Sequence, residues 1–288
     1  MTSPSVSKIV RAFDAWQQKR VVVAFPLAVA KRSSDTRAGR LAALMAYYGF
    51  LSAFPALLVM VTALGFVLDR RPDLRMRITD SVLSQFPIVG DSVAASAPSP
   101  LEGNRLALGI GLVAAIWAGL KAMQASQDAM NELWEVPVSS QPGFFTKRLR
   151  SLLMLGLLGV LMLCTTAFSQ APSLIGSARP WAVLLAFLTV LVNIGTFEVA
   201  FRVLTVSSVS WRQHLPGACI AGSAYSALQL AGGAYVRHVL AGAQRTYGAF
   251  AAIIGLTSWI YLISFVAVTS AQVNVVAARC LWPRSLLK

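Results

Sequence analysis

The feature that most constrains this chain is a series of six long stretches without a single Asp, Glu, Lys or Arg. A helix of about 20 apolar residues crosses the roughly 30 Å of hydrocarbon in a bilayer. Only 12% of all residues are charged, about half the share in a soluble domain. The sequence therefore predicts an all-helical integral membrane protein with six transmembrane helices, and it argues against a soluble enzyme or a nucleic-acid partner. The stretches cover residues 41–68, 106–120, 151–178, 180–197, 213–236 and 246–278.

The Lys and Arg residues predict the orientation of these spans. The net charge is +14, and 17 of the 25 basic residues fall in the segments that share a side with the two termini. Cytoplasmic loops of membrane proteins hold the excess of Lys and Arg, so both termini are predicted to be cytoplasmic. The resulting layout is a cytoplasmic or interfacial segment 1–40, a membrane domain 41–278 with an extracytoplasmic loop 69–105, and a short basic tail 279–288.

The first forty residues do not form a span. Apolar residues recur at helical spacing and leave the charged ones on the other face, which predicts an amphipathic helix lying in the membrane interface. The next apolar stretch, 21–30, is only ten residues long and contains Pro26, so we expect an interfacial or re-entrant elbow there. The apolar face comprises Val6, Ile9, Val10, Phe13 and Trp16, and the polar face comprises Lys8, Arg11, Asp14, Gln18 and Lys19.

Most candidate functional residues lie on one helix. The stretch 106–120 is short for a span, and we expect one helix to continue from it to about residue 135. One face of that helix presents Lys121, Gln124, Asp128 and Asn131. This face is either a solvated surface, with Asp128 paired to Lys121 or Glu132, or the lining of a vestibule open to the cytoplasm. The pattern favours the surface, and the vestibule is the hypothesis to test.

Four further polar residues are predicted at the same cytoplasmic depth. Glu198 and Arg202 have the i, i+4 order that favours a helix ion pair, and Gln272 and Asn274 lie near the end of the last span. Amide side chains there often bond across helices. A structural role is the simpler interpretation of all four, and a substrate pathway is the alternative.

Two local features concern helix shape and contact. Pro55 interrupts the first span and predicts a kink. Small residues spaced four apart in 213–236, such as Ala218, Gly222 and Ser226, predict close helix packing within the chain rather than between copies, although a homo-oligomer remains open.

Signs of enzyme or cofactor chemistry are missing from the sequence. The histidines are His214 and His238, and the predicted topology puts them on opposite sides of the membrane, so we expect no metal site. Phosphate-binding and hydrolase motifs are absent, and the three cysteines form no CxxC pair. We expect no cofactor and no catalysis.

Several segments resemble the YihY/virulence factor BrkB family of bacterial inner-membrane proteins. The similar segments are residues 45–55 (MAYYGFLSAFP), 131–136 (NELWEV), 211–218 (WRQHLPGA), Tyr247-Gly248 and 271–274 (AQVN). The resemblance implies six transmembrane helices in a bacterial inner membrane. An older label of that family, ribonuclease BN, has no support in this chain, because the two separated histidines cannot supply the metal cluster that such a nuclease needs. The family tends to have Glu at the position of Gln272.

The resemblance leaves the activity undefined. Its usual implication is transport of an envelope lipid or another amphiphile, with membrane lipids as partners. The alternative is a scaffold or envelope-assembly factor that transports nothing.

Overall fold

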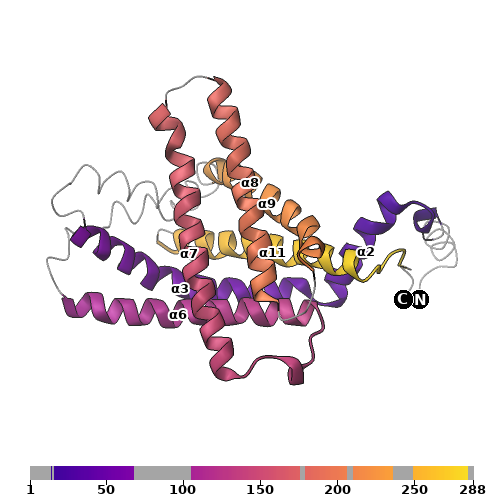
Figure 1. Cartoon of the computed structure of the whole chain (residues 1–288), viewed down its shortest axis with the longest axis horizontal. Helices are drawn as coiled ribbons and strands as arrows, with labels where there is room; N and C mark the ends of the chain where they lie inside the picture. The colour runs from indigo at the N-terminus through magenta and orange to yellow at the C-terminus, as the bar shows by residue number, and fades with distance from the viewer. Residues whose placement is uncertain are drawn as a thin grey trace.

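The computed structural model describes residues 14, 16–67, 105–175, 179–205, 210–235 and 249–284. Within these residues the chain is helical and contains no strand, so the all-helical prediction is confirmed for this part. Figure 1 shows the arrangement. The helices are α2 (Val21–Asp35), α3 (Ala38–Val67), α6 (Arg105–Leu133), the short 3-10 helix η1 (Val138–Ser140), α7 (Phe144–Ile175), α8 (Arg179–Leu204), α9 (Trp211–Tyr235) and α11 (Ala249–Ala278).

The helices form a layer crossed by a hairpin. α3 packs along α6 and α11, and α11 also packs on α9. α7 and α8 pack on each other and run across the direction of α3, α6 and α11 in Figure 1. The core lies between the N-terminal parts of α3 and α9 and the C-terminal parts of α6, α8 and α11. Its buried members include Leu41, Met130, Phe201 and Val275.

Two segments of the described chain are long and apolar enough to cross a membrane, namely Val183–Leu204 and Ile253–Ala278. They correspond to the predicted fourth and sixth spans. The four other predicted spans extend beyond the residues whose side chains are described. The count of six therefore stays a prediction.

The second predicted span is part of one long helix, as expected. α6 runs for 29 residues from Arg105 to Leu133 and ends two residues before the expected position. Ala118, Ala122, Ala125 and Ala129 are buried along it, because they form the small-residue face that contacts the neighbouring helices.

The small residues of α9 pack within the chain, as predicted. A Cβ at Gly222 would lie 2.6 Å from the backbone nitrogen of Ile194 in α8. A Cβ at Gly217 would collide with the Ser270 carbonyl and would lie 2.6 Å from the Asn274 side chain in α11. Only glycine permits these two close approaches.

The N-terminal part corrects two expectations. Residues 21–30 belong to helix α2, which contains Pro26 and continues to Asp35, so the chain bends at residues 36–37 and not within 21–30. The interfacial or re-entrant placement of this segment stays a prediction. Asp14 is buried rather than solvated, and it accepts a hydrogen bond from Gln17, which also donates to the Arg284 carbonyl. The C-terminal tail therefore covers this part of the expected polar face. Most of the amphipathic segment, the loop 69–104 and residues 285–288 lie outside the described residues.

Pro55 lies inside α3 without ending it. A proline there deprives the Leu51 carbonyl of its usual helical donor. The neighbouring Ser52 hydroxyl donates instead to the Gly49 carbonyl at 2.8 Å, so it does not replace that donor. The kink itself stays a prediction.

Candidate functional site

The C-terminal ends of α6 and α11 have the same backbone geometry. Glu135 and Cys280 both have a positive φ, 52° and 51°, a conformation that costs a non-glycine residue about 1–2 kcal/mol. After each helix a later amide bonds back to a carbonyl five residues earlier: Val136 to Asn131 at 2.9 Å, and Leu281 to Val276 at 3.1 Å. This is the Schellman motif. It leaves other carbonyls at the end of α6 in need of donors.

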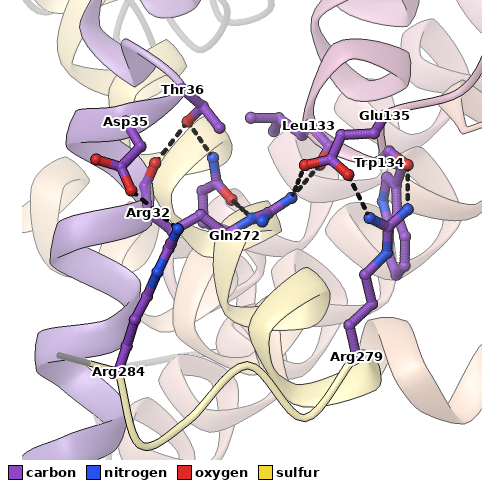
Figure 2. A network of polar contacts seen from close by, with 9 residues as sticks. All are labelled: Arg32, Asp35, Thr36, Leu133, Trp134, Glu135, Gln272, Arg279 and Arg284. Atoms are coloured by element: carbon purple, nitrogen blue, oxygen red, sulfur yellow. Dashed lines mark hydrogen bonds and ion pairs between the residues drawn. The ribbon is translucent and has the colours of Figure 1, made fainter. Parts of the chain in front are cut away.

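Two arginines supply those donors. Arg32 of α2 donates to the Leu133 carbonyl at 3.2 Å and to the Glu135 carboxylate at 2.9 Å. Arg279 donates to the Trp134 carbonyl, and to the other Glu135 oxygen at 2.7 Å. Cations at a helix C-terminus also interact favourably with the helix dipole. Glu135 thus joins three helices, as Figure 2 shows.

Gln272 connects α11 to the same arginine. Its side-chain oxygen accepts from Arg32 Nε at 3.1 Å, and its nitrogen donates to the Thr36 hydroxyl at 2.6 Å. Arg32 is 6% exposed and Gln272 is fully buried. We call Arg32, Thr36, Glu135, Gln272 and Arg279 the polar junction (Figure 2). Nearby, Arg284 forms an ion pair with Asp35 at 3.1 Å and ties the tail to α2.

The charges of the junction act on Glu135. Partial desolvation raises the pKa of this carboxyl, but the hydrogen bonds and positive charges of Arg279 and Arg32 outweigh that effect. Its pKa therefore lies below the usual value for Glu, and the carboxylate is ionised at neutral pH.

A second group of polar residues lies on α8, α9 and α11, where α9 packs against both other helices, and it is bonded very differently. Both Glu198 carboxylate oxygens are buried and accept no hydrogen bond, and His214 Nδ1 and Asn274 Nδ2 also lack partners. His214 and Asn274 are each 1% exposed. Arg202 interacts electrostatically with both Glu198 and His214. We call Glu198, Arg202, His214 and Asn274 the unpaired cluster.

Two contacts position the cluster. The Asn274 side-chain oxygen accepts a hydrogen bond from the Gly217 backbone at 2.7 Å, which fixes α11 against the first turns of α9. The His214 ring lies edge-on to the Trp134 ring, with centroids 5.6 Å apart. Trp134 also provides a carbonyl to Arg279, so the cluster and the polar junction are linked through one residue.

The structure separates the residues predicted on α6. Asp128 is exposed and pairs with Lys147 of α7, not with Lys121 or Glu132. Glu132 pairs instead with Arg40 of α3 at 2.8 Å, because the neighbouring helices approach this face from both sides.

The other predicted residues on this face differ in exposure. Lys121 is exposed, with its ammonium 5.9 Å from the Trp117 ring centroid, Gln124 is half-buried, and Asn131 is 2% exposed.

The remaining predictions have mixed outcomes. The predicted ion pair between Glu198 and Arg202 is not formed: the Glu198 carboxylate oxygens have no hydrogen-bonding partner. Gln272 and Asn274 bond across helices as expected, but to different neighbours, α2 and α9.

Four residues of these two groups were not candidates in the sequence analysis, namely Arg32, Thr36, Arg279 and His214. Arg32 and Arg279 were counted only as basic residues outside the spans, and His214 was considered only as a metal ligand and rejected. A cation directly after an apolar stretch was the available signal for Arg32. The position of His214 within the segment 211–218 was the available signal for the histidine.

In the described residues no group of three or more His, Cys, Asp or Glu side chains could hold a metal ion. The chemistry that the unpaired cluster offers is hydrogen bonding and charge. A carboxylate, a guanidinium and an imidazole lie near one another, with acceptor and donor atoms that a polar group could fill.

The chain is similar to known proteins over most of its length. It is 29% identical over 165 residues to the inner membrane protein YhjD of Escherichia coli K12, covering 54% of this chain and 48% of that protein, so the match spans about half of YhjD. It is 25% identical over 245 residues to the putative ribonuclease-like protein YfkH of Bacillus subtilis 168, covering 80% of this chain and 86% of that one. No solved structure matches. The family model for virulence factor BrkB matches residues 29–285, and the chain therefore belongs to the virulence factor BrkB family.

Proposed function

We propose that the chain is a multi-pass protein of a bacterial inner membrane. Its relative YhjD is named an inner membrane protein, and the number of passes comes from the sequence. The apolar surface supports this. Val183, Leu184, Phe187 and Leu191 are all exposed on one side of α8. An apolar stripe of this kind would be unfavourable in water, and a lipid environment would cover it.

The proposed topology has six spans and cytoplasmic termini. It is tested with single cysteines at Ser96, in the loop 69–105, and at Ser139, before α7, in a chain whose native cysteines are replaced. An impermeant thiol reagent applied to intact cells is expected to label the first and not the second. The reverse pattern would overturn the orientation.

The function that this arrangement supports best is translocation of an amphiphile with a polar headgroup, without catalysis by this chain. The observation that supports it is Glu198, whose two carboxylate oxygens are buried without a partner. Buried polar groups are normally hydrogen-bonded, and ionisable residues within membrane spans usually mark a substrate or ion path. A passing headgroup would satisfy Glu198, Arg202, His214 and Asn274 in turn, while its chains stay in lipid.

We further propose that the exposed face of α6 forms the cytoplasmic approach to this cluster. Lys121, Gln124 and Asp128 line it, and the buried Asn131 lies one turn further toward the core. Asp128→Asn and Lys121→Gln are each expected to slow translocation while leaving folding intact, because an ion pair such as Asp128–Lys147 contributes at most about 1 kcal/mol near the surface and Lys121 is exposed. Wild-type translocation rates in both variants would show that this face of α6 is only a solvated surface.

The experiment is a translocation assay in proteoliposomes with fluorescent phospholipids. Dithionite quenches only the outer leaflet, so a protein that moves lipid raises the quenched fraction above one half. Phosphatidylglycerol, phosphatidylethanolamine and phosphatidylcholine probes are compared with protein-free vesicles. Quenching that stays at the protein-free level for every probe would favour the scaffold alternative.

A further inference from the structure

Two grooves follow the seam between α3 and α11. The first, about 640 Å³, lies between α2, α3, α9 and α11. Its lining includes Phe25, Val29, Gly39, Phe265 and Thr269, and its surface is almost wholly apolar. The second, about 430 Å³, lies further along α3 and α11, between residues such as Tyr47, Phe50 and Leu262. Both volumes lie in the range of small-molecule sites.

The two grooves lie on the same side of the seam. On α11 the lining residues Thr257, Tyr261, Phe265, Thr269 and Val273 recur every fourth position. Consecutive members are therefore neighbours on the helix surface, along a line that drifts by about 40° at each step. Tyr261 lines the second groove, and its hydroxyl lies 3.4 Å from where a Cβ would stand on Gly39 of the first. The grooves therefore lie end to end, and the Tyr261 hydroxyl packs between them in the space that the missing side chain of Gly39 leaves.

The seam is longer than the hydrocarbon of one leaflet is deep. Thr257 to Val273 spans about 24 Å at 1.5 Å per residue, whereas one leaflet contributes about 15 Å of hydrocarbon. α2 covers one end of the seam, because Ala24, Ala28 and Arg32 are its buried stripe and the adjacent stripe of Phe25, Val29 and Ser33 faces the groove.

The end of the seam at the α2–α3 corner is polar and basic. Ser33 lines the groove there, and its hydroxyl is buried without a partner. Ser34 also lines it, and the exposed Arg37 precedes the lining residues Ala38 and Gly39. In the proposed topology this corner lies at the cytoplasmic headgroup level, where anionic lipids attract Lys and Arg.

We propose that this seam binds one acyl chain of an anionic glycerophospholipid from the cytoplasmic leaflet. The chain lies along α11 past Gly39 and Tyr261, and the phosphate group lies near Ser33 and Arg37. This inference rests on the proposed function, since it names the lipid class and its docking place, but lipid binding here is measured separately from translocation.

The test is photolabelling of the full chain in nanodiscs containing phosphatidylglycerol with a diazirine on one acyl chain. Labelled residues are expected between positions 38 and 50 and between 257 and 273. Thr269→Trp fills the first groove and is expected to lower seam labelling at least about fivefold, because a bulky ring replaces the space of several methylene groups. The matched control is Thr189→Trp. Both hydroxyls donate to the carbonyl four residues earlier, at 2.7 Å and 2.8 Å, but Thr189 lines neither groove.

A second arm tests the headgroup. Labelling by the phosphatidylglycerol probe is expected to exceed labelling by a phosphatidylcholine probe, and Arg37→Gln is expected to remove that preference, whereas Arg212→Gln retains it. Labelling spread evenly over exposed helices and unchanged by Thr269→Trp would overturn the inference in favour of ordinary surrounding lipid. Dimers cross-linked through cysteines on the seam would overturn it in favour of a second copy. Seam labelling without translocation would leave the inference standing and remove the proposed function.

Discussion

The polar junction and the unpaired cluster lie next to each other, yet their polar atoms are satisfied to opposite degrees. In the junction, the buried Arg32 guanidinium donates to a side-chain amide, a backbone carbonyl and a carboxylate. In the cluster, Glu198, His214 and Asn274 each leave buried polar atoms without a partner. A saturated network stabilises one arrangement of helices, whereas unpaired buried groups cost free energy that a ligand can recover.

Because their hydrogen bonding differs, we assign separate roles to the polar junction and the unpaired cluster. The junction holds α2, α6 and α11 together through residues distant in sequence, while the cluster keeps hydrogen-bonding capacity unused. Variants of the junction should therefore change stability, and variants of the cluster should change activity.

The largest expected effect is the loss of Arg32. Arg32→Met keeps an apolar stem but leaves the Gln272 side-chain oxygen, one of the two Glu135 oxygens and the Leu133 carbonyl without a donor, which should cost about 3 kcal/mol. The melting temperature in detergent measures it. Arg40→Met is the control, because the Arg40–Glu132 pair is exposed and should contribute less than about 1 kcal/mol. Equal losses in both variants would contradict the special role of the junction.

The next effect concerns how α8 and α9 hold the cluster. Gly222→Ala places a methyl group 2.6 Å from the Ile194 backbone, and the helices must separate, at about 2 kcal/mol. Gly195→Ala meets no atom within 4 Å and should stabilise α8 by about 0.5–1 kcal/mol. Opposite shifts in melting temperature are expected. Equal destabilisation by both substitutions would show that the close contact between Gly222 and the Ile194 backbone does not determine how α8 packs on α9.

A smaller effect is the pH dependence of the junction. The pKa of Glu135 is lowered in the folded state, so its stabilisation is fully present above the ordinary Glu value of about 4.3. It is lost as pH falls below that value toward the folded pKa. Melting temperatures between pH 7 and pH 3 are expected to fall less steeply in Glu135→Gln than in wild type. Glu132→Gln should follow the wild-type curve more closely, and a Glu135→Gln curve parallel to wild type would refute the assignment.

The smallest effect comes from the helix ends. Cys280 has a φ of 51°, so Cys280→Gly should relieve strain and stabilise the chain by about 1 kcal/mol. Cys219→Gly, in the interior of α9, should destabilise it by a few tenths of a kcal/mol. Thermal melts of the two variants in parallel would show shifts of opposite sign. A destabilising Cys280→Gly would contradict the left-handed conformation at this end.

The positions of the helices could be predicted from the sequence better than the polar contacts between them. Charge-free stretches and the alanine stripe of α6 follow from local periodicity, and Gly222 follows from small-residue spacing. The junction could not be predicted in this way, because Arg32 and Glu135 are 103 residues apart and Arg279 is a further 144 residues along. A left-handed Glu135 also has no sequence signature, since glycine is the usual residue at such a position.

The candidate site shows the same limit. Glu198 and Arg202 have the spacing of a helix ion pair, but the Glu198 oxygens accept no hydrogen bond from Arg202 or from any other group. The partner of Asp128 is Lys147 of α7 rather than a residue of its own helix, so the helical wheel identified the residue but not its contact.

If the unpaired cluster acts on substrate while the polar junction maintains the fold, the Glu198→Gln variant should lose activity without losing stability. Its melting temperature and its rate of lipid translocation are measured in the same proteoliposome preparation, beside Glu132→Gln. The account predicts a melting temperature within about 2 °C of wild type, because no hydrogen bond is lost, together with at least a tenfold slower translocation, about 1.4 kcal/mol in the barrier. A wild-type rate in Glu198→Gln, with Glu132→Gln also unchanged, would contradict it.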